Sequence, residues 1–191
     1  MPYIPLPTTA YTELNPPSLV PSTNIENIHP DEPTMPTPVH SATLTPPLSG
    51  RDAVADALYR CLIGIDAADD ALFKSAFTAD AIFDVNGMVT DGFDAINSQC
   101  YAIVAKLDTS HYASNLRINT TDDDSKAQLT CSAMAQHYPG GEGMKADSVQ
   151  FLAGGFYYLD LVKDSGDGLW KIKHWTVKST WSQGDSSVVG R

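Results

Sequence analysis

The chain has 191 residues, of which 42% are hydrophobic, so it is long enough for one globular domain with additional segments. Its formal net charge of -11 argues against binding to nucleic acid or to an anionic membrane surface, because both require a basic footprint. No stretch approaches the ~20 apolar residues of a membrane span, and the start lacks the pattern of a secretory signal, so a cytoplasmic protein is expected.

The distribution of proline marks a boundary near residue 48. Of the 13 prolines, all but Pro139 precede it. Residues 1–47 are also rich in Thr and Ser, and their apolar residues follow neither a helical nor a strand period. We predict a disordered or extended arm, which could also lie along the domain surface or a neighbouring subunit. Residues 48–184 then form the domain, and residues 185–191 form a short C-terminal tail.

Three helices are predicted in the first half of the domain. The first begins near residue 48 and ends near Asp66, because its apolar residues are spaced by three and four: Val54, Leu58, Cys61, Leu62 and Ile65. Asp69 is the expected N-cap of a short second helix. Gly92 precedes a third helix over about residues 93–107.

Strands dominate the rest of the domain. One covers residues 81–85 and ends at an Asn-Gly turn, and four long ones cover 110–120, 126–138, 148–163 and 169–182. This order predicts the α+β class, with three N-terminal helices packed on a curved, mainly antiparallel sheet. Such a cone-shaped α+β barrel has an open mouth, and we expect a ligand pocket there.

The strand around residues 108–119 carries a histidine near its start. Strict alternation places His111, Ala113, Asn115 and Arg117 on one face, and Tyr112, Ser114, Leu116 and Ile118 on the other. If the polar face lines the pocket, it forms the wall of an active site. If it faces solvent, it is an ordinary strand surface.

The sequence contains no sign of a metal site or a cofactor site. Its three cysteines, Cys61, Cys100 and Cys131, are widely spaced and lack a partner at metal-ligand spacing, so we interpret them as buried free thiols. Neither a phosphate-binding loop nor a dinucleotide fingerprint is present. Chemistry without a cofactor is therefore expected.

The order of the elements, together with four local motifs, resembles the SnoaL-like branch of the nuclear-transport-factor-2-like superfamily over about residues 50–184. The motifs are Ile65-Asp66-Ala67-Ala68-Asp69, Ser110-His111 with Asn115, Gly154-Gly155 running into Tyr157, Tyr158 and Asp160, and Asp167-Gly168-Leu169-Trp170-Lys171-Ile172. The resemblance implies the cone fold. It leaves the function open, because this fold carries several enzyme activities as well as non-catalytic subunits.

Within the superfamily, the final hairpin is similar to that of the scytalone dehydratases. The aspartate and the first histidine of their catalytic set fall on Asp66 and His111. The other four members fall on Ile65, near Val85, near Cys131, and near Tyr158 or Leu159. Because only two of the six are kept, scytalone itself is not the expected substrate.

His111 and Asp66 are the predicted catalytic residues. An imidazole can accept and donate protons near neutral pH, and a carboxylate can hold it in one tautomer or act as the base itself. The alternative is that His111 is an ordinary hydrogen-bonded strand residue and that Asp66, with Asp69, caps the second helix.

Further side chains are predicted to bind the substrate. His137 shares a strand face with small residues that would leave room for a ligand, whereas His174 is a weaker candidate. Tyr157 and Tyr158 face opposite ways, so at most one points inward. The predicted substrate-binding set is Tyr59, Phe83, Asn115, Cys131, His137, Tyr157, Tyr158 and Trp181.

Two hypotheses of function follow. The first is a cofactor-independent biosynthetic enzyme, a cyclase, isomerase or dehydratase, that acts by acid/base catalysis on a polyketide- or terpenoid-like molecule. The second is a non-catalytic binding or assembly subunit resembling the β chain of a ring-hydroxylating dioxygenase. Water addition to an epoxide is a minor third, for which Arg117 is the one arginine in a predicted strand. In each case a homo-oligomer through the open sheet face is expected.

Overall fold

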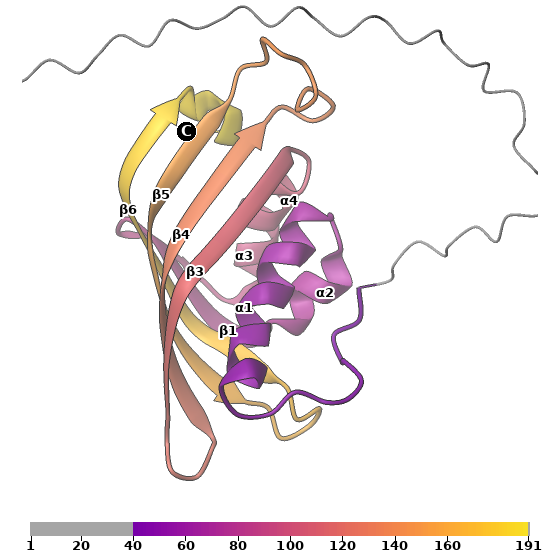
Figure 1. Cartoon of the computed structure of the whole chain (residues 1–191), viewed down its shortest axis with the longest axis vertical. Coiled ribbons are helices and arrows are strands. Elements are labelled where there is room, and N and C mark those ends of the chain that lie inside the picture. Colours follow the sequence, from indigo (N-terminus) through magenta and orange to yellow (C-terminus); the bar gives the residue numbers. More distant parts are fainter. Residues whose placement is uncertain (1–39, 191) are drawn as a thin grey trace, which may run out of the picture. The chain divides into compact units, whose positions relative to one another are not determined.

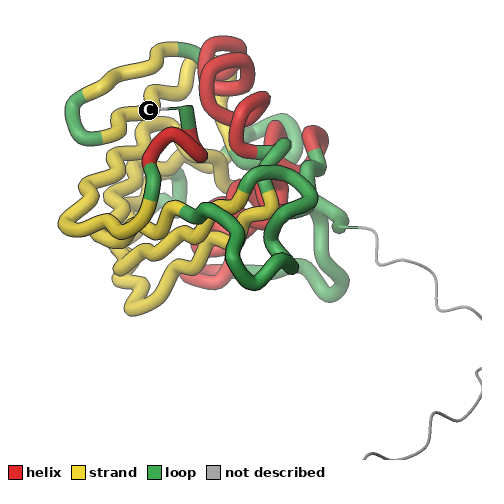
Figure 2. The backbone as a smooth tube through the Cα atoms, turned by 90° about the horizontal axis from the view of Figure 1, so that it is seen from above, coloured by secondary structure: helices red, strands yellow, loops and turns green. Residues whose placement is uncertain are grey.

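The computed structural model describes residues 40–190, so most of the predicted N-terminal arm lies outside the described residues. Within that range, helices cover one face of a curved six-stranded sheet (Figure 1). Figure 2 shows the same layers from above, with the helical turns beside the strands. The predicted α+β fold is confirmed. No helix in the described range has the length and apolar character needed to cross a membrane.

The helical layer follows the predicted order. Its elements are α1 (Gly50–Asp66), α2 (Asp70–Ser75) and a third segment made of α3 (Phe93–Ile96), the π-helical η1 (Asn97–Tyr101) and α4 (Ala102–Val104). The third segment was predicted as one regular helix and instead contains a π-helical turn. A short 3-10 helix, η2 (Ser186–Val189), follows the last strand in the predicted C-terminal tail.

The sheet is open and has the strand order β2-β1-β6-β5-β4-β3. Among the strands of residues 40–190, only β1 and β6 pair in parallel; the other neighbours are antiparallel. The strands are β1 (Phe77–Val85), β2 (Met88–Asp91), β3 (Asp108–Thr120), β4 (Lys126–Tyr138), β5 (Phe151–Lys163) and β6 (Trp170–Gly184). Strand β2 was not among the predicted strands, because this four-residue edge strand is largely exposed and lacks apolar alternation.

The core lies between the helices and the inner face of the sheet. Fully buried aliphatic residues from both layers, including Leu58, Leu129 and Ile172, meet there. Phe73 of α2 stacks on Tyr101 at 4.6 Å between ring centroids and tilts against Phe77 at 4.9 Å. This burial removes the apolar stripe of each helix from water and stabilises the packing of the helices on the sheet.

The joint between α1 and α2 is tight because Gly64 lacks a side chain. A Cβ atom there would lie 2.6 Å from the backbone nitrogen of Phe73, so any larger residue would push the helices apart. Asp69 caps α2, as its carboxylate accepts the backbone N–H of Leu72 at 2.9 Å. The joint thereby places Asp66, the last residue of α1, beside β3.

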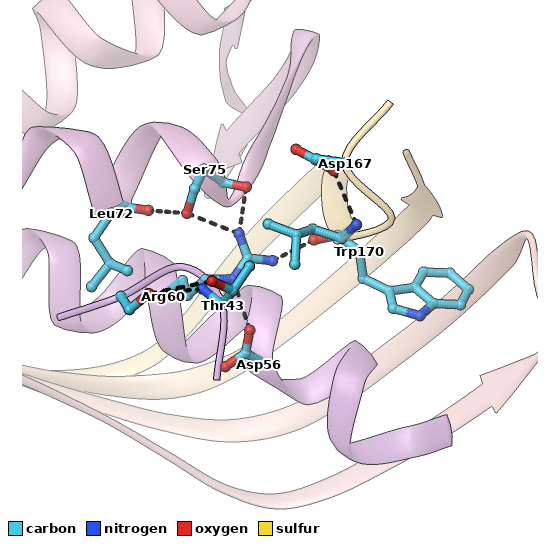
Figure 3. Close-up of polar contacts among 9 residues, drawn as sticks. Thr43, Asp56, Arg60, Leu72, Ser75, Asp167 and Trp170 are labelled. Carbon is cyan, nitrogen blue, oxygen red and sulfur yellow. Dashed lines mark hydrogen bonds and ion pairs between the residues drawn. The ribbon is translucent and has the colours of Figure 1, made fainter. Parts of the chain in front are cut away.

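Arg60 joins α1 to α2 and to β6 through hydrogen bonds (Figure 3). Its side chain is 3% exposed and donates to the Asp56 carboxylate at 2.8 Å, to the Ser75 hydroxyl at 2.9 Å and to the Trp170 carbonyl at 2.6 Å; it also donates to the Ser75 carbonyl. Every nitrogen of the guanidinium is therefore engaged, which compensates for its burial.

A β-bulge in β3 corrects the predicted alternation. Ser114 pairs with Ser132 and Arg117 with Thr130, so Asn115 and Leu116 together oppose one residue of β4. Asn115 adopts a positive φ of 57°, which Asn tolerates better than most residues. Beyond the bulge the faces exchange. Leu116 and Ile118 therefore join the face of His111, while Asn115 and Arg117 are exposed.

Candidate active site

Asp66 holds His111 through two hydrogen bonds. One carboxylate oxygen lies 2.7 Å from the ring Nδ1, and the other accepts the His111 backbone N–H at 2.7 Å. The imidazole is 9% exposed and the carboxylate 25%. Since Asp69 provides the cap of α2, the carboxylate of Asp66 is free to engage the strand instead of the helix.

The tautomer of His111 follows from this contact. A carboxylate oxygen accepts hydrogen bonds, so Nδ1 carries the hydrogen and the lone pair of the neutral ring is on Nε2. The negative charge at 2.7 Å would also stabilise the ring after it takes up a proton. This arrangement can serve a proton-transfer step at Nε2.

A second imidazole lies beside the first. His137 of β4 is 7% exposed, and its Nδ1 is 3.2 Å from the carbonyl oxygen of Phe151. Its ring is almost perpendicular to that of His111, with centroids 5.2 Å apart. Two groups that can exchange protons therefore lie on the same wall.

Both histidines line a cavity of about 430 Å³ between the sheet and the helices. Much of the lining is apolar, including Ile65, Phe83, Val85, Ile103, Phe151 and Trp175. Val189 and Gly190, from the C-terminal turn after β6, also contribute. This segment falls in the predicted C-terminal tail, where the apolar Val188-Val189 pair is the local signal of packing. A cavity of this size suits a small organic molecule.

Tyr157 brings a phenol group to the same cavity. It is 6% exposed, and its ring meets that of Trp175 edge to face at 5.0 Å. Burial, reinforced by nearby thiols and by Asp66, raises the pKa of Tyr157 well above its usual value. The hydroxyl therefore stays protonated. Tyr158, the next residue, is 43% exposed and lies on the opposite face of β5.

The structure divides the predicted substrate-binding residues into three groups. Phe83, His137 and Tyr157 line the cavity of His111. Tyr59 and Tyr158 line a second cavity of about 820 Å³ instead. Tyr59 shares a helix face with Asp66, but seven residues of helix separate them by about 10 Å along the axis, so the two reach different spaces.

Asn115, Cys131 and Trp181 line neither of these two cavities. The bulge turns Asn115 outward, where its amide contacts the Ser132 hydroxyl at 3.2 Å. Cys131 is packed in the core, and burial raises its pKa to about 11, so it remains a thiol. Trp181 lies on the outer sheet face against Gly154, whose missing side chain makes room for the indole.

The described residues include no group of three or more His, Cys, Asp or Glu side chains arranged to hold a metal ion. The groups at the cavity that can donate or accept a proton include two imidazoles, a carboxylate and a phenol. All four belong to different elements: α1, β3, β4 and β5.

Comparison with known proteins shows the family of the chain. The family model of the SnoaL-like domain matches residues 46–176. Terrestric acid biosynthesis cluster protein E of Penicillium crustosum is 59% identical over 157 residues, which are 82% of this chain and 100% of that protein.

Solved structures show the same fold at low identity. A candidate scytalone dehydratase from Novosphingobium aromaticivorans DSM 12444 is 19% identical, with a TM-score of 0.60 over 71% of this chain and 87% of that chain. The hexachlorocyclohexane dehydrochlorinase LinA-type3 from Novosphingobium barchaimii LL02 is 20% identical, with a TM-score of 0.57 over 72% and 91%. The chain belongs to the SnoaL-like domain family.

Proposed function

We propose that this protein is a cofactor-independent biosynthetic enzyme of the lyase or isomerase type. His111 transfers a proton to or from a small molecule bound in the cavity, and Asp66 orients it. The main support is the pair of 2.7 Å contacts from Asp66 that orient His111 at a cavity of about 430 Å³. The 59% identical relative is named for a biosynthesis cluster, which supports a substrate of secondary metabolism.

The geometry supports one chemical step in particular. Nε2 of His111 removes a proton from an acidic C–H bond of the substrate, and the freed electron pair moves toward a neighbouring carbonyl group. The Asp66 carboxylate stabilises the imidazolium that results. Return of the proton to another carbon completes an isomerisation or cyclisation. Delivery of the proton from Nε2 of His111 to a hydroxyl group releases water and completes a dehydration; His137, whose ring centroid lies 5.2 Å away, is a second group that could carry this proton.

Two other hypotheses fit the site less well. A non-catalytic subunit needs no polar groups in its interior, yet the cavity holds two oriented imidazoles and a phenol. Water addition to an epoxide would need Arg117 to face the same space. The bulge places Arg117 on the outer face and in the lining of the other cavity.

We also propose that a second copy of the chain covers the outer sheet face. Large apolar side chains gather there in neighbouring strands, with exposed fractions between 40% and 57%: Tyr112, Met134, Phe156, Tyr158 and Trp181. Exposed patches of this kind mark interfaces. Light scattering should give a dimer or a larger homo-oligomer, which Trp181→Ser shifts toward monomer. A wild-type monomer at high concentration would contradict this.

The function can be tested with a natural substrate source. An extract is prepared from a Penicillium crustosum strain that lacks the gene for cluster protein E, and it is incubated with the purified protein. Mass spectrometry should show one accumulated compound replaced by a product of equal mass, or lighter by one water, without added cofactor. His111→Asn and Asp66→Asn should form little product. Full turnover by both folded variants would overturn the assignment.

A further inference from the structure

Tyr157 carries a hydroxyl group for which the described residues supply no hydrogen-bond partner. The residue is 6% exposed, and no hydrogen bond to its hydroxyl is formed within residues 40–190. The hydroxyl oxygen is not among the fully buried polar atoms that lack a partner in this range, so it keeps contact with open space. Because Tyr157 also lines the cavity of His111, a bound ligand is the partner that the position suits.

The groups around the Tyr157 phenol determine whether it is protonated. Besides burial, the ionisable groups that raise its pKa are Cys61, Cys131, Asp66 and Cys100, and none of them is a cation. Burial is the main cause of the raised pKa, and these neighbours add to it. The phenol is therefore a hydrogen-bond donor and not a phenolate.

Asp66 connects the phenol to the dyad. The carboxylate that holds His111 at 2.7 Å is also close enough to Tyr157 to raise its pKa. The base and the donor thus belong to one cavity, but they come from β3 and β5, with β4 between them. A substrate bound between them would present its acidic carbon to one and an oxygen to the other.

We propose that the Tyr157 hydroxyl binds the carbonyl oxygen of the substrate, which makes the substrate an enolisable carbonyl compound. This inference rests on the proposed function. When His111 takes the proton from the carbon beside the carbonyl, the C–H electron pair forms a C=C bond and the carbonyl pair moves onto oxygen. The oxygen becomes negative while it accepts the Tyr157 hydrogen bond. The proton stays on Nε2 until it is returned to the product.

Such a donor acts mainly on the charge that develops in the transition state. Loss of one donor of this type costs about 10²- to 10³-fold in kcat. Tyr157→Phe removes only the hydroxyl and keeps the ring against Trp175, so the fold should be retained. Tyr158→Phe is the matched control, because it makes the same chemical change one residue away on the opposite face.

The test combines turnover with binding of a probe. Turnover uses the compound that accumulates in the fungal extract, and the probe is 4-nitrophenolate, a planar oxyanion whose absorbance changes on hydrogen bonding. Tyr157→Phe should lower kcat by at least about 10²-fold with a smaller change in KM. It should weaken probe binding about tenfold to hundredfold, since the lost bond is to a charged acceptor. Tyr158→Phe should change neither.

The outcomes separate this inference from the function on which it rests. If Tyr157→Phe matches the wild type in both measurements while His111→Asn is inactive, the donor role is wrong and the enzyme assignment stands. If His111→Asn turns the compound over normally, the proposed function fails. Equal losses in Tyr157→Phe and Tyr158→Phe would also overturn the inference, because they would show a general effect of the strand.

Discussion

Helix α1 contributes to two short polar pairs for which we propose different roles. Near its middle, Arg60 binds Asp56 at 2.8 Å with 3% of its side chain exposed. At its last residue, Asp66 binds His111 at 2.7 Å, and the imidazole is 9% exposed. Both pairs are short and largely buried, so neither distance nor burial separates a structural pair from a chemical one.

The two pairs differ in the hydrogen-bonding capacity that each side chain has left. Each guanidinium nitrogen of Arg60 is bonded within the protein, and its partners Ser75 and Trp170 belong to elements that must be held together. His111 keeps one ring nitrogen that Asp66 does not engage, and its ring lines a cavity. A fully satisfied group stabilises a fold, whereas a group with free capacity at a cavity can act on a ligand.

The largest expected effect tests the second pair. His111→Asn keeps a donor for Asp66 but removes the nitrogen that faces the cavity. We expect kcat on the accumulated fungal compound to fall about 10³-fold, within the range for loss of general acid–base catalysis. The unfolding midpoint in urea should change little. A large fall in the urea midpoint of His111→Asn, together with the loss of activity, would show that this pair is structural as well.

The second prediction tests the first pair. Arg60→Met leaves Asp56 and two carbonyl oxygens without their donor, and removal of one partner of a buried pair costs about 3 kcal/mol or more. Urea unfolding should show this loss of stability. Activity per folded molecule should stay at the wild-type level in conditions where the variant is folded. A selective loss of kcat would contradict the division between the two pairs.

The third prediction concerns the neighbouring imidazole. His137→Asn can keep the hydrogen bond to the Phe151 carbonyl, but it cannot carry a proton. If His137 delivers protons, kcat should fall about tenfold to hundredfold, at the lower end for acid–base groups. His174→Asn is the control, since His174 lines the other cavity. Equal rates for both variants would limit His137 to packing.

The smallest effect comes from a carboxylate that shares β3 with His111. Asp108 accepts the backbone N–H groups of Gly143 and Gly141, which lower its pKa. A lowered folded-state pKa adds stability above the unfolded value, and this stability is lost as the pH falls through the folded value. Asp108→Asn should therefore destabilise the protein slightly at neutral pH, and the difference should vanish in acid. A gap that persists in acid would contradict this explanation.

Periodicity predicted most of the fold but only part of the site. The predicted helical spacing around Leu58 and the predicted alternation in the long strands agree with the structure, because burial of one face enforces both patterns. The bulge at Asn115 was not predicted, since a single positive φ leaves little trace in sequence. It nevertheless exchanges the sheet face of every later side chain in β3. Contacts with high sequence separation, such as that of Arg60 with Trp170, cannot be read from local pattern.

The candidate site shows the same limit. His111 and Asp66 were predicted through family resemblance and not through spacing, as 45 residues separate them. Alternation established that Tyr157 and Tyr158 face opposite ways, but only the packing of β5 shows which one is buried. Tyr59 satisfied helical periodicity and still reached another cavity. Direction along an element, and not only its face, decides which side chains meet.

The most direct test of the account is a crystal structure of the His111→Asn variant with the accumulated fungal compound bound. We predict that the compound occupies the cavity of about 430 Å³, with its acidic carbon beside position 111 and its carbonyl oxygen within hydrogen-bond distance of the Tyr157 hydroxyl. Density in the cavity lined by Tyr59 and Tyr158, with the first cavity empty, would contradict it.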